Sequence, residues 1–140
     1  MFCNIKDRIN DSVVREIMAQ SAFDQSREAM DRKAEELNRH VSWQLFGWLE
    51  DEEIVGICGF VVFIDYIEIL NIAVAEHSQH KGFGCRMITE LWNKYKITIK
   101  AETDDDAVDF YRKCGFSTIE ISKYNVRRWT CVLEDKQVIS

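Results

Sequence analysis

The segment Glu68–Gly84, with the sequence EILNIAVAEHSQHKGFG, passes from an apolar run into a loop that contains two glycines. The apolar run belongs to a predicted strand over residues 66–75, in which only Glu68 and Asn71 interrupt the apolar residues of the two faces. This pattern is typical of a central strand with both faces covered. Residues after the loop return to helical spacing, at Phe83, Met87, Ile88, Leu91, Trp92 and Tyr95. The segment therefore predicts a strand, a tight turn and a helix in that order.

The glycine-bearing loop has the elements of an anion site. A strand that turns directly into a helix leaves backbone N–H groups unpaired at the positive end of the helix dipole. Gly82 and Gly84 allow a tight turn and let a phosphate approach without a Cβ in the way. The loop lacks the Gly-x-x-x-x-Gly-Lys-Ser/Thr spacing of nucleoside triphosphate sites and the third glycine of a dinucleotide-binding loop. By itself it predicts either an anion site or an ordinary turn without a ligand.

Residue periodicity places the other elements around this segment. Upstream, apolar residues at helical spacing predict helices over residues 11–22, behind Asn10 or Asp11 as caps, and 26–40. Two runs at 42–50 and 54–64, joined by an acidic turn, predict a hairpin. Downstream, the pattern predicts a strand at 96–102, a helix at 104–114 and two strands at 116–121 and 126–133. The helix is expected to begin at a Thr103-x-x-Asp106 capping box and to end at Gly115, and Trp129, Cys131 and Leu133 are expected to face inward.

Composition restricts the possible functions. The 140 residues favour a single domain over residues 1–140, and the formal charge of −6 disfavours binding to duplex nucleic acid or anionic membranes. The charged N-terminus is unlike a signal peptide, and the longest uncharged run, residues 54–64, is too short to span a bilayer. Five widely spaced cysteines form no Cys-x-x-Cys motif, so we expect reduced thiols and a cytoplasmic protein. Residues His77 and His80 have no third ligand beside them other than Glu76, and no metal site is predicted.

Two motifs in this order resemble those of the GNAT acetyltransferase superfamily. The first is Gln79-x-x-Gly82-x-Gly84, which is similar to the Gln/Arg-x-x-Gly-x-Gly/Ala loop that follows the fourth strand in that family. The second is Ala107-x-x-Phe110-Tyr111-x-x-x-Gly115-Phe116, on the predicted helix 104–114. The resemblance covers residues 42–121. It implies an α+β fold, with a mixed, mostly antiparallel twisted sheet of six to seven strands and helices on both faces.

The resemblance also implies that acetyl-CoA is the cosubstrate. Loop N–H groups would hold the pyrophosphate with Lys81 as a nearby cation, and the main chain of Ile72 and Val74 would bind the pantetheine arm where the strand separates from its neighbour. The implied cosubstrate-binding residues are Ile72, Ala73, Val74, Gln79, His80, Lys81, Gly82, Phe83, Gly84, Asp104, Ala107 and Phe110. Asp104 departs from the family, which often has Asn there, and a carboxylate that only caps the helix is the alternative.

Two residues are candidates for acid and base catalysis. Tyr111 matches the tyrosine that protonates the departing thiolate in this family, and a phenol is a suitable acid because it stays neutral in the resting enzyme. The alternative is a core tyrosine whose hydroxyl is bonded within the protein. Glu68 is the candidate base. On a regular pleat it shares a face with Leu70, Ile72 and Val74, which would raise its pKa, although a bulge would change that face and a nearby lysine could pair with it.

The implied reaction is N-acetylation of a primary amine of a small molecule or peptide by direct attack in a ternary complex. Residues 41–75 contain six acids and no Lys or Arg, and two of these acids, Asp65 and Glu68, favour a cationic acceptor. A homodimer is compatible with the family. Cys85 is expected to be a packed residue, with a covalent acetyl-cysteine as the alternative. The competing functions are a non-catalytic sensor or interaction module that binds CoA or acetyl-CoA, and a small globular protein without a cofactor.

Overall fold

The computed structural model describes residues 1–22 and 24–134. Its elements are β1 (Phe2–Asn4), η1 (Lys6–Arg8), α1 (Ser12–Gln20), α2 (Arg27–Arg39), β2 (Trp43–Glu50), β3 (Glu53–Val62), β4 (Tyr66–Val74), η2 (Glu76–Ser78), α3 (Phe83–Tyr95), β5 (Thr98–Thr103), α4 (Val108–Lys113), β6 (Ser117–Lys123) and β7 (Val126–Leu133). No helix in this described part is long and apolar enough to cross a membrane.

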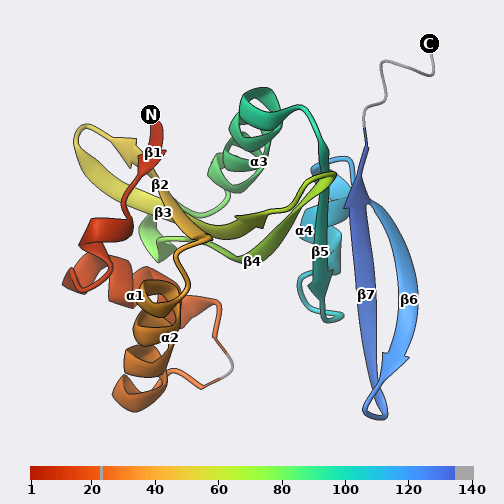
Figure 1. The fold of residues 1–140 in the computed structure, drawn as a ribbon, viewed down its shortest axis with the longest axis horizontal. Coiled ribbons are helices and arrows are strands. Elements are labelled where there is room, and N and C mark those ends of the chain that lie inside the picture. The colour runs from red at the N-terminus through yellow and green to blue at the C-terminus, as the bar shows by residue number, and fades with distance from the viewer. Residues whose placement is uncertain (23, 135–140) are drawn as a thin grey trace.

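The strands form one sheet in the order β1-β2-β3-β4-β5-β7-β6. All neighbouring pairs are antiparallel except β4 and β5, which are parallel. Helices α1 and α2 cover one face of the sheet, and α3 lies on the opposite face (Figure 1). Two apolar clusters correspond to these faces, because residues of α1 and α2 pack with one set of strand residues and residues of α3 and α4 pack with the other. The predicted α+β sheet with helices on both faces is confirmed.

Most predicted elements lie where the periodicity placed them. Strand β4 is central, with three strands on each side, and β7 covers the predicted residues 126–133. Helix α2 begins after Ser26, whose hydroxyl accepts a hydrogen bond from the N–H of Ala29 at 3.2 Å. Strand β1 was not predicted, because three residues carry too little periodicity to show a strand.

The predicted helix 104–114 is wrong in its first turns, since α4 contains only Val108–Lys113. The predicted capping box is also wrong, because the carboxylate of Asp104, rather than Thr103 or Asp106, accepts the N–H of Ala107 at 3.0 Å. These contacts stabilise a separate turn that precedes the helix.

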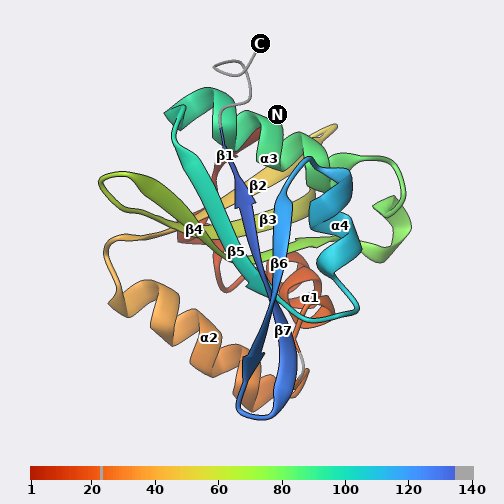
Figure 2. The same cartoon turned by 90° about the vertical axis from the view of Figure 1, so that its right-hand side faces the viewer.

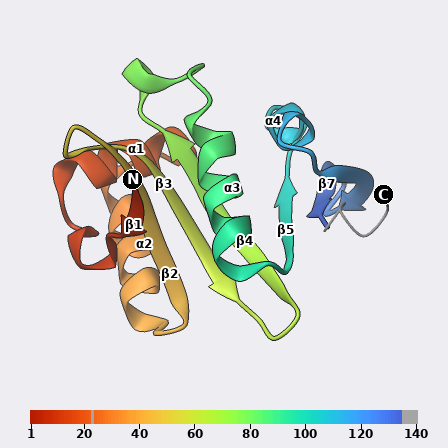
Figure 3. The same ribbon diagram turned by 90° about the horizontal axis from the view of Figure 1, so that it is seen from above.

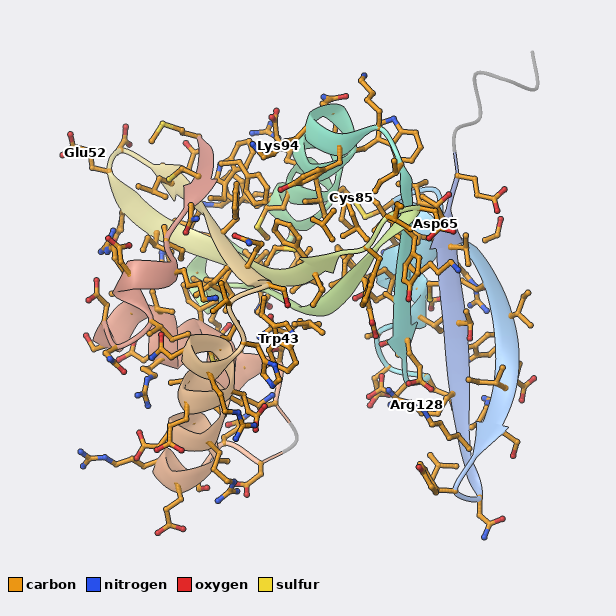
Figure 4. All side chains as sticks on the ribbon, in the orientation of Figure 1. Trp43, Glu52, Asp65, Cys85, Lys94 and Arg128 are labelled. Atoms are coloured by element: carbon orange, nitrogen blue, oxygen red, sulfur yellow. A yellow bond between two sulfur atoms is a disulfide. The ribbon has the colours of Figure 1, made fainter. Side chains whose placement is uncertain are left out.

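Two helices are joined covalently on the α3 side of the sheet. Cys85, in the first turn of α3, forms a disulfide with Cys114, which ends α4. Figure 4 labels Cys85 at this end of α3. Cys3, Cys58 and Cys131 are free thiols. The expectation that all thiols are reduced is therefore wrong for one pair, because folding brings together two cysteines that are 29 residues apart.

Candidate active site

The sheet opens between its two parallel strands. Strand β4 pairs with β5 only at Tyr66, Ile67 and Glu68, although both strands continue beyond this point. Seen from above, the two strands diverge toward the ends at which α3 begins and α4 lies (Figure 3). Backbone groups along the second half of β4 therefore border an opening on this side instead of a neighbouring strand.

A bulge divides β4 at the start of this opening. Asn71 pairs with Gly59 and Ile69 pairs with Phe60, so Leu70 is an extra residue with no partner on β3. An extra residue reverses the alternation of side chains beyond it. The side chain of Ile69 packs on the α3 side before the bulge, and that of Ile72 packs on the same side after it.

The bulge corrects the predicted position of Glu68. Its neighbours in the strand, Ile67 and Ile69, both point to the α3 side, so Glu68 points to the side of α1 and α2. The predicted shared face with Ile72 and Val74 is therefore wrong. Glu68 is exposed, and no ion pair is found for it in residues 1–22 and 24–134. The apolar surroundings predicted for this carboxylate are absent.

A lysine lies beside Glu68 on the next strand but forms no ion pair with it. Lys100 is its cross-strand partner on β5. The ammonium of Lys100 lies 4.4 Å from the centre of the Tyr66 ring instead of pairing with the carboxylate. Glu68 thus ends the paired part of β4 as an exposed acid on the α1–α2 face.

The loop before α3 has the predicted geometry of a tight turn. Gly82 adopts a φ of 84°, in the left-handed region, and a Cβ placed there would meet no atom within 4 Å. The glycine is needed for its backbone conformation, and its surface is open to a ligand. The first hydrogen bond of the helix runs from the N–H of Arg86 to the carbonyl of Gly82. The backbone N–H groups before it, those of Gly82, Phe83, Gly84 and Cys85, therefore have no acceptor among the described residues.

The side chain of Gln79 ties this loop to the open strand. Its Nε2 donates to the carbonyl of Val74 at 3.1 Å and to Oε1 of Gln20, on α1, at 3.3 Å. His77 and His80 are exposed, and the described residues hold no group of three His, Cys, Asp or Glu side chains that could bind a metal. Gln79 therefore has a structural contact in addition to the role predicted for its loop.

The two sequence motifs meet at Gly84. A Cβ at this position would lie 2.5 Å from Cε1 of Phe110 and 2.9 Å from its Cζ, so the ring of α4 occupies the space that a side chain would need. Cys85 follows Gly84 in the sequence, and its disulfide with Cys114 joins the same two helices. The first turn of α3 is thus held against α4 (Figure 2).

Tyr111 follows Phe110 and combines a buried ring with an unbonded hydroxyl. The side chain is 6% exposed and packs edge-on against Phe110 and Phe116, with ring centres 5.1 and 5.2 Å away. Burial raises the pKa of Tyr111 above the ordinary value of a phenol, so it is neutral at physiological pH. Its hydroxyl has no hydrogen-bond partner among the described residues and is not fully enclosed. The alternative predicted a core hydroxyl bonded within the protein, and the described residues provide the core packing but no partner for the hydroxyl.

The acids before α4 have structural partners. The carboxylate of Asp104 caps the turn at Ala107, which precedes α4, whereas the alternative interpretation predicted a cap of the helix itself. Asp105 accepts two hydrogen bonds of 2.9 Å from Arg127 and one of 2.7 Å from Nε1 of Trp129. These contacts connect β7 to the turn, and the hydrogen bonds to Arg127 and Trp129 lower the pKa of Asp105.

A family model described as an acetyltransferase (GNAT) domain matches residues 42–118. The chain belongs to the GNAT acetyltransferase family. An N-acetyltransferase of Bacillus methanolicus is 35% identical over 72 residues, which are 51% of this chain and 59% of that relative. The match thus spans less than two thirds of the relative's length.

Solved structures of this family share the fold. A GNAT-family acetyltransferase from Desulfovibrio desulfuricans superimposes with a TM-score of 0.78 at 20% identity, covering 96% of this chain and 98% of that one. An aminoglycoside 6'-N-acetyltransferase in complex with coenzyme A has a TM-score of 0.70 at 16% identity, with 95% and 96% covered. The predicted GNAT fold is confirmed.

The contact between the two motifs can be tested by paired substitutions. Gly84→Ala is expected to lower the free energy of unfolding by about 1–3 kcal/mol, because the new methyl group overlaps the Phe110 ring. In a Phe110→Ala background the same change should cost much less, since the ring is gone. Urea unfolding of the four proteins measures this coupling.

Gly82→Ala is the matched control. It should cost about 1–2 kcal/mol through its left-handed backbone in both backgrounds, because no atom stands near its Cβ. An equal cost of Gly84→Ala with and without the Phe110 ring would disprove the contact.

Proposed function

We propose that this protein is an acetyl-CoA-dependent N-acetyltransferase that uses a ternary complex. The observation that best supports the proposal is the opening between β4 and β5, which lies near the helix of Tyr111. It is bordered by the N–H groups at the start of α3, for which residues 1–22 and 24–134 provide no acceptor. An extended thioester with an anionic end matches a site with a free strand edge and a helix N-terminus. Membership of the family supports the same chemistry.

The loop and β4 would bind acetyl-CoA in two parts. The N–H groups from Gly82 to Cys85 are available to the pyrophosphate, and Lys81 adds an exposed cation beside them. The pantetheine arm would extend along the main chain of Ile72, Ala73 and Val74. The remaining proposed contacts are made by Gln79, His80, Ala107 and Phe110, whereas Asp104 serves as a cap.

The acceptor would reach the opening from the opposite face. Tyr111 and the start of α3 belong to one side of the sheet, and Glu68 points to the side of α1 and α2. An amine on this second side would attack the acetyl carbonyl through the opening, with its proton passing to Glu68 or to a water held by Glu68. The position of Glu68, although different from the predicted one, therefore suits a base that acts across the sheet.

Transfer forms a C–N bond and breaks the C–S bond of the thioester. The amine is the nucleophile, main-chain N–H groups of β4 polarise the carbonyl, and the thiolate of CoA leaves. Tyr111 would donate its proton to that thiolate, since its raised pKa keeps it protonated and its hydroxyl has no competing partner in the described residues. Burial raises the pKa of the Cys58 thiol to about 12, which excludes it as a resting thiolate.

The charge near the opening favours a cationic acceptor. Residues 41–75 contain no Lys or Arg, and Asp65 lies at the β3–β4 turn, three residues before Glu68 (Figure 4). One structural neighbour is an aminoglycoside acetyltransferase, and another is a chimera of a spermidine N-acetyltransferase, which is named for a polyamine. We therefore include primary amines of cationic small molecules and peptides in the acceptor class.

The wild-type protein is expected to bind acetyl-CoA and to release free thiol only when a suitable amine is present. A thermal melt with acetyl-CoA tests binding, because a ligand that binds the folded state raises the melting temperature. Thiol release is then measured with polyamines, aminoglycosides, amino acids and peptides. Binding without amine-dependent release would indicate a sensor, and no thermal shift would overturn the proposal.

Tyr111→Phe is expected to lower turnover about ten-fold or more while the affinity for acetyl-CoA stays near that of the wild type. The substitution removes the acidic hydroxyl and keeps the buried ring. Thiol release and calorimetric titration measure the two quantities. Tyr95→Phe is the control, since burial also raises the pKa of Tyr95 but it lies at the end of α3, outside the site. Full activity of Tyr111→Phe would remove this residue from the mechanism.

Glu68→Gln is expected to lower turnover about ten-fold or more near neutral pH without changing acetyl-CoA affinity, because the amide cannot accept the amine proton. The rate should recover in part at higher pH, where more of the free amine is unprotonated. Glu90→Gln, at an exposed position of α3, is the matched control. A pH–rate profile identical to that of the wild type would exclude Glu68 as the base.

A further inference from the structure

The bulge of β4 is held by a side chain from within the strand. Oδ1 of Asn71 accepts a hydrogen bond from the backbone N–H of Gly59, on β3, at 3.0 Å. These two residues are also paired in the ladder, directly beside the unpaired Leu70. The hydrogen bond thus lies at the point where the register of the two strands shifts.

Gly59 provides the space for this contact. A Cβ built on Gly59 would lie 2.3 Å from Oδ1 of Asn71, closer than two non-bonded atoms can approach. The amide of Asn71 therefore covers the α-carbon of Gly59 in the position that a side chain would occupy. The two residues depend on each other. The side-chain amide of Asn71 occupies the space that Gly59 leaves free, and Oδ1 of that amide accepts the N–H of Gly59.

The bulge decides which residues of β4 present their main chain to the opening. The N–H of Ala75 bonds to the carbonyl of Val55 on β3. Main-chain direction alternates along a strand, so the groups of Ala73 also face β3, and those of Ile72 and Val74 face the opening. Without the extra residue Leu70, the alternation of main-chain groups in the second half of β4 would shift by one residue relative to the paired first half.

We propose that Asn71 is a positioning residue for acetyl transfer. By bonding Gly59 it fixes the bulge, and the bulge directs the main chain of Ile72 toward the acetyl carbonyl. This inference depends on the proposed function, because it assigns the acetyl group to the opening. Asn71 acts through the backbone of the next residue and does not itself contact the acetyl group.

The test compares acetyl-CoA with CoA, which lacks the acetyl carbonyl. Asn71→Ala removes the acceptor atom and is expected to lower kcat about ten-fold or more, since small displacements of reacting groups have large effects on rate. It should also reduce the preference for acetyl-CoA over CoA in calorimetric titrations, while CoA affinity changes little. Asn71→Asp, which keeps an oxygen at the same position, should restore much of both quantities. Asn93→Ala, at an exposed position of α3, is the control.

A second variant reaches the same contact from the other strand. Gly59→Ala should displace the Asn71 amide and reproduce the loss of kcat and of acetyl-CoA preference. The double variant Gly59→Ala/Asn71→Ala should be no worse than Asn71→Ala, because the methyl group then has no amide to displace. Hydrogen exchange of the Gly59 amide, compared between Asn71→Ala and the wild type, reports whether the hydrogen bond is lost in a folded protein.

The outcomes separate this inference from the proposed function. If the wild type neither binds acetyl-CoA nor turns it over, the proposed function fails. If the wild type is active and Asn71→Ala exposes the Gly59 amide but weakens CoA and acetyl-CoA equally, Asn71 has a structural role only and the inference is overturned. Unchanged kcat in Asn71→Ala also overturns it.

Discussion

Strands β4 and β5 share a parallel ladder for three residues and then separate, and the other features of the site depend on this separation. A parallel pair requires a crossover, which here is the loop and α3, and the helix begins beside the end of β4. The separation leaves a strand edge, a helix N-terminus and a buried tyrosine around one opening. Had the ladder continued, the backbone groups of β4 would have been bonded to β5 and none would be available to a ligand.

Aromatic and small residues keep this opening in place. The ring of Phe110 packs against Gly84, so the loop at the start of α3 and the helix of Tyr111 are positioned by one contact. The same packing buries the ring of Tyr111 and leaves its hydroxyl without a partner among the described residues. A core contact and a chemical property thus arise from the same short helix, which explains why Gly84 of the first motif occurs together with Phe110 and Tyr111 of the second.

Periodicity in the sequence predicted the features that depend on local pattern. Strand and helix types followed from the spacing of apolar residues, and the two motifs indicated which segments meet. The errors came from contacts between distant residues. The predicted helix 104–114 began too early because Asp105 is held by β7, and the face of Glu68 was wrong because Asn71 and Gly59 stabilise a bulge that no alternation of apolar residues reveals. Similarly, nothing in the spacing of five cysteines indicated which two would pair.

The bond between Cys85 and Cys114 also changes how the chain is connected. It closes a covalent ring that includes most of α3, all of β5 and α4, and therefore Tyr111 itself. A single cut of the main chain anywhere inside this ring leaves both parts of the protein attached to each other. Cleavage there would remain invisible on a gel run without reductant, and the loop and the tyrosine helix would stay on one molecule after the backbone between them had been broken.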